Sequence, residues 1–94
     1  MSKDDYDVIV FKILVYLYAV LKRKVIFEEK AFYHAIGEIN NRYLVDVLNF
    51  MQEEGLISGL VFVKAWGNEN ILCNDLINLK ITVQGIHYLE ENKK

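Results

Sequence analysis

The chain has 94 residues, a hydrophobic fraction of 53%, one cysteine and a formal net charge of −2. This length suits one domain with one core, and the hydrophobic fraction excludes an intrinsically disordered chain. A lone cysteine excludes the disulfide framework of small secreted domains, and the negative net charge excludes a protein with a general basic excess for binding nucleic acid.

The N-terminal sequence indicates the expected compartment. Residues 1–7 are polar and acidic, unlike the basic start of a secretory signal peptide. The apolar run over residues 8–21 is interrupted by Lys12 and falls short of the roughly 20 residues that cross a bilayer. We therefore expect a cytoplasmic protein that does not associate with a membrane.

Residues 4–23 have the strongest helical pattern in the chain. They contain no Gly or Pro, and their acidic start and basic end complement a helix dipole. Apolar residues occupy nearly every side, and a helix that is apolar all round must be buried all round. We therefore expect one apolar stripe to form the core and a second one to form a homodimer interface. The core stripe is Val10, Phe11, Leu14, Leu17, Tyr18 and Leu21, and the candidate dimer interface is Ile9, Ile13, Tyr16 and Val20.

Three further elements are expected between residues 25 and 54. The β-branched and aromatic residues 25–27 predict a short edge strand. Residues 28–36 predict a short helix that ends at Gly37. Residues 41–54 predict a recognition-type helix with an asparagine cap and a glycine stop. Its apolar stripe has the spacing of an amphipathic helix, with Leu44, Val47, Leu48 and Met51.

The second half of the chain changes to a strand-like pattern. Residues 57–81 predict a hairpin, with turn residues at 67–70 and a returning strand interrupted at 74–75. Residues 82–92 predict a last helix capped by Thr82. The order of elements predicts an α+β fold of the winged helix-turn-helix type in a single domain. It has a three-helix core, a β-hairpin wing and a C-terminal helix.

Two runs of the sequence carry a resemblance to known proteins. Residues 49–59, NFMQEEGLISG, are similar to the end of a recognition helix and its turn into the wing. Residues 79–92, LKITVQGIHYLEEN, resemble the closure of many bacterial winged-helix regulators, a strand, Thr, two residues, Gly and a helix. In length and element order the chain resembles the YjcQ-like family of small bacterial winged-helix proteins. This resemblance implies a winged-helix fold, a bacterial or phage setting and a DNA-binding role, and it supplies no catalytic residues.

A winged helix reads DNA with the N-terminal part of the second helix of its helix-turn-helix. Arginine suits guanine, asparagine suits adenine, and an apolar side chain can touch a thymine methyl group. We therefore expect residues 41–49 to face the major groove and the wing tip to reach an adjacent groove or phosphate. The candidate DNA-binding residues are Asn41, Arg42, Val45, Asn49, Lys64, Trp66, Asn68 and Asn70.

The charge of the same region favours a different partner. Residues 25–55 contain six acidic and two basic residues, a net charge of −4. An acidic segment opposes docking against phosphates, and the basic residues gather instead at 22–24. Two interpretations therefore stay open. The leading interpretation is a homodimeric DNA-binding transcriptional regulator, and the alternative is a winged-helix module that binds a protein partner and no DNA.

Catalytic and metal-binding chemistry have no matching motif. His34 and His87 are far apart and Cys73 stands alone, so no spacing matches a zinc site. Ser2 and Ser58 are the only serines, and the five glycines occur singly, without a phosphate-binding loop. We expect no enzymatic activity, no metal and no cofactor.

Overall fold

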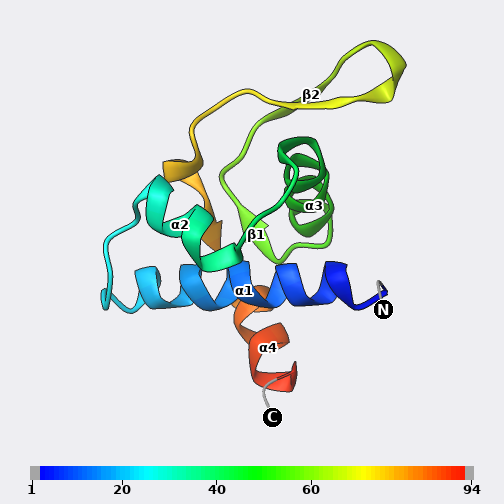
Figure 1. The fold of residues 1–94 in the computed structure, drawn as a ribbon. Coiled ribbons are helices and arrows are strands. Elements are labelled where there is room, and N and C mark those ends of the chain that lie inside the picture. The colour runs from blue at the N-terminus through cyan, green and yellow to red at the C-terminus, as the bar shows by residue number, and fades with distance from the viewer. Residues whose placement is uncertain (1–2, 93–94) are drawn as a thin grey trace.

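The computed structural model describes residues 3–92, and the side chains from residue 6 onward (Figure 1). The fold is α+β, in the arrangement of a winged helix-turn-helix with a three-helix core, a hairpin wing and a C-terminal helix. No helix within this range is long and apolar enough to cross a membrane. The elements are α1 (Lys3–Leu21), α2 (Glu29–Ile36), α3 (Asn41–Glu53), β1 (Ile57–Ser58), β2 (Phe62–Lys64), the 3₁₀ turn η1 (Trp66–Asn68), β3 (Asn70–Leu72), the 3₁₀ turn η2 (Leu76–Asn78), β4 (Lys80–Ile81) and α4 (Val83–Asn92).

Helix α1 runs through the middle of the molecule. Figure 1 shows α2 and α3 on one side of it and α4 on the other, and α1 also contacts β4. These elements cover α1 from several directions, so its nearly all-round apolar character is satisfied within one chain. Its fully buried side chains are Val10, Ile13, Leu14 and Leu17.

The second apolar stripe of α1 lies partly inside this core, and the burial of Ile13 corrects the assignment of that residue to the predicted dimer interface. Ile13 is fully buried in the core of its own chain and has no surface to offer a second copy. Tyr16 and Ile9 are half-buried against the same core. Val20, also half-buried, lines a cleft of the same chain. The sequence pattern places Ile13 at an interface because it does not show that α2, α3, α4 and β4 all pack against α1.

Residues 25–27 form a loop, and the strand predicted there is wrong. The Phe27 ring packs against Tyr16 and Phe32, with ring centroids 5.7 Å away in both pairs. The hydroxyl of Tyr16 accepts a hydrogen bond from the backbone N–H of Glu28 at 3.1 Å. These contacts fix the segment to the junction of α1 and α2, so its apolar residues are used in packing and not in a sheet.

Helix α3 is set by its cap and its apolar stripe. The Asn40 side chain accepts hydrogen bonds from the backbone N–H groups of Arg42 (2.9 Å) and Tyr43 (3.2 Å). This cap satisfies two of the N–H groups that a helix start leaves without partners. The four stripe residues are buried as their spacing predicts: Leu44, Val47, Leu48 and Met51.

The hairpin consists of two antiparallel pairs, β1 with β4 at the base and β2 with β3 in the wing. Between them the Asn74 side chain takes the place of a strand. Its amide donates to the carbonyl of Gly59 at 2.9 Å, and its oxygen accepts from the N–H of Val61 at 3.0 Å. Gly59 has a φ of +97°, and a Cβ there would lie 2.0 Å from the carbonyl oxygen of Asn78. Only glycine fits this crossing point.

Thr82 and Gly85 connect the start of α4 to the rest of the fold. The Thr82 hydroxyl donates to the carbonyl of Gly55 and accepts from the N–H of Gly85 at 3.0 Å, so it caps α4 and ties it to the end of α3. Gly85 is buried, and a Cβ there would lie 2.3 Å from the carbonyl oxygen of Leu56. The spacing of Thr and Gly therefore lets α4 start directly against the base of the hairpin.

Candidate interaction surface

The start of the wing is joined to α3 by the Gln52 side chain. The Gln52 amide donates to the carbonyl of Leu60 at 2.8 Å, and its oxygen accepts from the N–H of Leu60 at 3.0 Å. This pair of bonds imitates the pairing of two strands, and it is partly buried. These two bonds fix the start of the wing, at the backbone of Leu60, against α3.

Two polar contacts join the outer face of α3 to the start of the returning strand of the wing, at residues 69 and 70. Arg42 Nε lies 3.0 Å from Glu69 Oε2. The Asn70 amide donates to Asp46 Oδ1 at 3.1 Å. An exposed ion pair such as that between Arg42 and Glu69 contributes only about 0–1 kcal/mol to stability. Its larger effect is on charge, because Glu69 neutralises the one cation that α3 presents.

The eight candidate DNA-binding residues fall into two groups. On α3, Asn41 and Arg42 are exposed, whereas Val45 and Asn49 are half-buried. On the wing, the three residues at and near the tip are exposed and Asn70 is half-buried. In the structure Arg42 and Asn70 lie in one polar cluster between α3 and the wing. Each contacts an acidic residue that was not among the predicted site residues. The exposed wing residues are Lys64, Trp66 and Asn68, and the acidic residues are Asp46 and Glu69.

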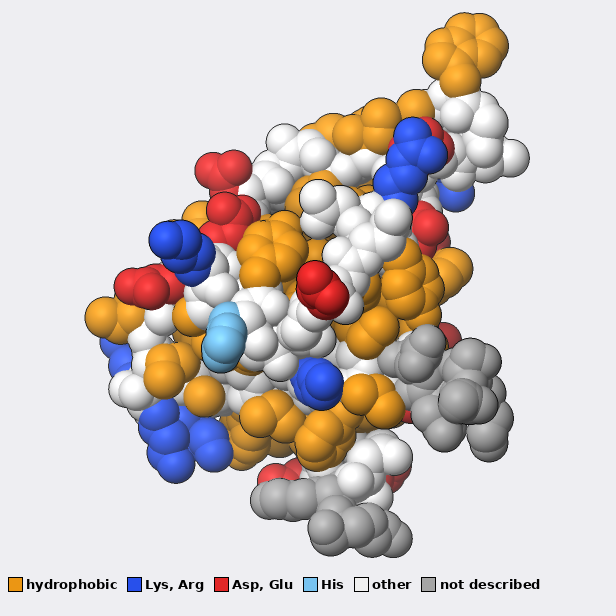
Figure 2. Space-filling view, in the orientation of Figure 1, with side chains coloured by type: hydrophobic (Ala, Val, Ile, Leu, Met, Phe, Trp, Pro, Cys, Tyr) orange, Lys and Arg blue, Asp and Glu red, His pale blue; other side chains and the backbone are white. Residues whose placement is uncertain are grey.

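The outer face of the wing is apolar. In the β2–β3 register Val63 lies opposite Ile71, and the N–H of Cys73 donates to the carbonyl of Val61 at 2.8 Å. These four residues lie on one face of the hairpin, because alternate residues of a strand point to the same side. All four side chains are exposed on that face. Figure 2 shows hydrophobic side chains running along the wing toward its tip.

The tip of the wing presents Trp66. The turn is closed by a hydrogen bond from the N–H of Ala65 to the carbonyl of Glu69 at 2.7 Å. Gly67 and Asn68 adopt positive φ values of 73° and 62° within it. On this backbone-bonded turn the Trp66 side chain is 97% exposed. Tryptophan is enriched among the residues that dominate the affinity of protein interfaces, which makes this exposure informative.

A second aromatic patch lies on the flank of α3. Tyr43 and Phe50 are exposed there, and the Tyr6 ring packs edge-on to Phe50 with centroids 6.3 Å apart. Burial raises the pKa of Tyr6 above its ordinary value, and the charge of Glu54 adds to this effect. Burial also raises the pKa of Tyr33 and Tyr88. These phenols therefore stay neutral at physiological pH and act as hydrogen-bonding and apolar surface.

The comparisons with known proteins bear on the whole fold. The model of the YjcQ protein family matches residues 11–94, a range that includes most of α1 and every later element. No curated protein and no solved structure matches the chain.

Proposed function

The chain belongs to the YjcQ family, and we propose that it is a protein-interaction module that binds its partner through the wing. The observation that carries this proposal is the 97% exposed Trp66 at the end of an apolar hairpin face. The contact surface consists of that tip and the outer wing face. This face is formed by Val61, Val63, Ile71 and Cys73.

The size of the exposed tryptophan supports the proposal energetically. A buried tryptophan removes roughly 150–250 Å² from water, which at about 25 cal/mol per Å² gives on the order of 4–6 kcal/mol. Part of this gain offsets the cost of association. In the free protein none of it is realised at Trp66, so a partner with an apolar pocket recovers it on binding.

The charges beside the wing indicate the charge that the partner carries around its apolar pocket. Asp46 and Glu53 lie on the outer face of α3, and Arg42 there is already paired with Glu69. The net charge of this face is therefore negative. A partner with basic residues around an apolar pocket fits it, whereas a run of phosphates is repelled.

The proposal is tested by retention of a protein from a nuclease-treated bacterial lysate on the immobilised domain. The unmodified domain should retain a stoichiometric protein, and the double variant Trp66→Ser and Val63→Thr should lose it. Both positions are exposed, so the circular dichroism spectrum should not change. Val83→Ser on α4, which is 67% exposed and away from the wing, is the matched control and should retain the protein. Equal retention by all three proteins would rule out the wing as the contact.

DNA binding is the second candidate function. The observation that favours it is the exposed N-terminal turn of α3, with Asn41 and Arg42 beside a wing, as in a base-reading helix-turn-helix. Here Arg42→Ala should weaken binding to a selected site by roughly 1–3 kcal/mol. Fluorescence anisotropy with a random duplex library at two salt concentrations decides between the functions. Salt-dependent binding that Arg42→Ala weakens would favour DNA, and no binding at low salt would leave the protein partner.

A further inference from the structure

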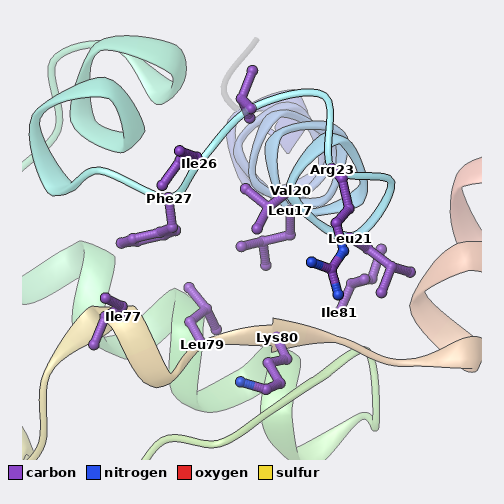
Figure 3. A pocket seen from close by; sticks show the side chains of 11 residues that line it. Leu17, Val20, Leu21, Arg23, Ile26, Phe27, Ile77, Leu79, Lys80 and Ile81 are labelled. Carbon is purple, nitrogen blue, oxygen red and sulfur yellow. The ribbon is translucent and has the colours of Figure 1, made fainter.

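A cleft of about 550 Å³ opens between the end of α1, the loop at 22–28 and the segment from η2 to β4 (Figure 3). Its volume lies in the range of about 300–1,000 Å³ that is usual for small-molecule sites. Nine of its eleven lining residues are apolar, and the other two are the cations Arg23 and Lys80. A mostly apolar wall with a few polar groups is the usual composition of a ligand pocket.

Residues 25–27, which form a loop and not a strand, line one side of the cleft. Phe27 is held at the α1–α2 junction, so the loop does not pair with β4. Among residues 3–92, strand β4 pairs with β1 and leaves its other edge free. The N–H of Thr82 donates to Leu56 on the β1 side, and alternation along a strand turns the N–H of Ile81 to the free edge. The free edge therefore offers the N–H of Ile81, a residue that lines the cleft, as a hydrogen-bond donor.

Large apolar side chains at the rim of the cleft are open to solvent. Ile26 is 85% exposed and Ile77 is 64% exposed, and they come from opposite sides of the opening. Deeper in, Leu17 and Leu79 are buried and form the floor. An apolar ligand that lies on this floor would also cover the two isoleucines at the rim.

The two cations indicate the charge of the ligand. Figure 3 shows the Arg23 side chain extending from the turn after α1 toward β4, the strand that carries Lys80. Both residues are exposed, and neither has an ion-pair partner among the described side chains. Arg23 also has a φ of 65°, which is unusual for a residue with a long side chain. The electrostatic complement of this rim is an anion.

We propose that this cleft binds a small amphipathic anion, with its apolar body along the floor and its carboxylate or similar group at Arg23 and Lys80. The ligand is a medium-chain carboxylate or a molecule of the same chemistry. The site is separate from the wing, and the proposal does not rest on the proposed function. Loss of wing binding and loss of ligand binding are therefore independent results.

Decanoate is the probe, and amide chemical shifts in a ¹H–¹⁵N NMR titration are the measurement. Saturable shifts should appear at cleft residues such as Val20, Ile26 and Ile81. The double variant Arg23→Asn and Lys80→Gln should weaken decanoate binding at least tenfold. Asparagine is chosen at position 23 because it tolerates positive φ. Decanol has an alkyl chain of the same length without the charge. It should bind the unmodified protein and the double variant with the same low affinity.

Two further variants separate the site from general surface effects. Lys24→Gln removes a charge from the same loop at a residue that does not line this cleft, and it should bind decanoate as the unmodified protein does. Ile26→Ser changes a side chain that is 85% exposed, so the protein should fold and bind decanoate more weakly. Shifts confined to other surfaces, equal affinity for decanol, or no saturable binding at millimolar decanoate would each overturn the proposal.

Discussion

Gly85 is the residue at which α4 approaches the base of the hairpin most closely. A Cβ at this position would lie 2.3 Å from the carbonyl oxygen of Leu56 and 2.8 Å from Ile81 Cγ1. Alanine stabilises a helix by about 1 kcal/mol relative to glycine, but overpacking a core costs about 1–3 kcal/mol or more. A backbone oxygen cannot rotate away as a side chain can. We therefore expect Gly85→Ala to lower the free energy of unfolding by about 2 kcal/mol.

Urea unfolding followed by circular dichroism measures this change. Val83→Ala, in the same helix at a side chain that is 67% exposed, is the control and should change stability by about 0.5 kcal/mol or less. A stabilised Gly85→Ala protein would mean that α4 can move away from Leu56 at little cost.

At the scale of elements, the wing depends on the contact between Gln52 and the backbone of Leu60. Gln52→Ala removes both hydrogen bonds and leaves a partly buried N–H and C=O without these partners. Leaving such groups unsatisfied costs about 1–3 kcal/mol. We expect amide hydrogens of the wing, residues 61–64 and 70–73, to exchange with solvent at least tenfold faster. The exchange rates of the α1 amide hydrogens should change much less.

The control for this experiment is Glu53→Ala. It changes the next residue of α3, whose side chain is exposed. Its wing amides should exchange at the rate of the unmodified protein. Unchanged exchange in Gln52→Ala would show that the wing is held by its other contacts, such as the one between Asn70 and Asp46.

Elements whose signals are local could be predicted from the sequence. Helix α3 is an example, because its cap at Asn40 and its buried stripe both lie within one segment. The strand expected at 25–27 depends on a partner edge elsewhere in the fold, and Phe27 instead finds aromatic neighbours on α1 and α2. For the same reason the site was predicted only in part. The pairing of Arg42 with Glu69 depends on the angle of the wing, which no local pattern encodes.

At the scale of the whole molecule, α1 is the central helix, which contacts α2, α3, α4 and β4. Ile13 is fully buried on it. Replacing a buried isoleucine with alanine costs about 2–5 kcal/mol, through lost transfer energy and the cavity left behind. We expect Ile13→Ala to lose this much stability in urea unfolding and to keep the molecular mass of the unmodified protein in light scattering.

Val15→Ala is the matched control for α1. Val15 lies two residues away and is exposed, so its loss should cost about 0.5 kcal/mol or less. A change of mass in Ile13→Ala, without a large loss of stability, would restore the original assignment of this residue to a contact between copies.

The apolar outer face of the wing has a consequence for the solubility of the free protein. In the part of the chain that the structure describes, strands β2 and β3 pair only with each other, so their sheet has open edges. Residues 60–66 contain a single charge, that of Lys64. Short apolar β segments with open edges are templates for aggregation, and a charged residue within them acts as a gatekeeper. Any opening of the wing during folding exposes this segment further. The colloidal stability of the protein at high concentration therefore depends on Lys64 and on how rarely the wing leaves α3.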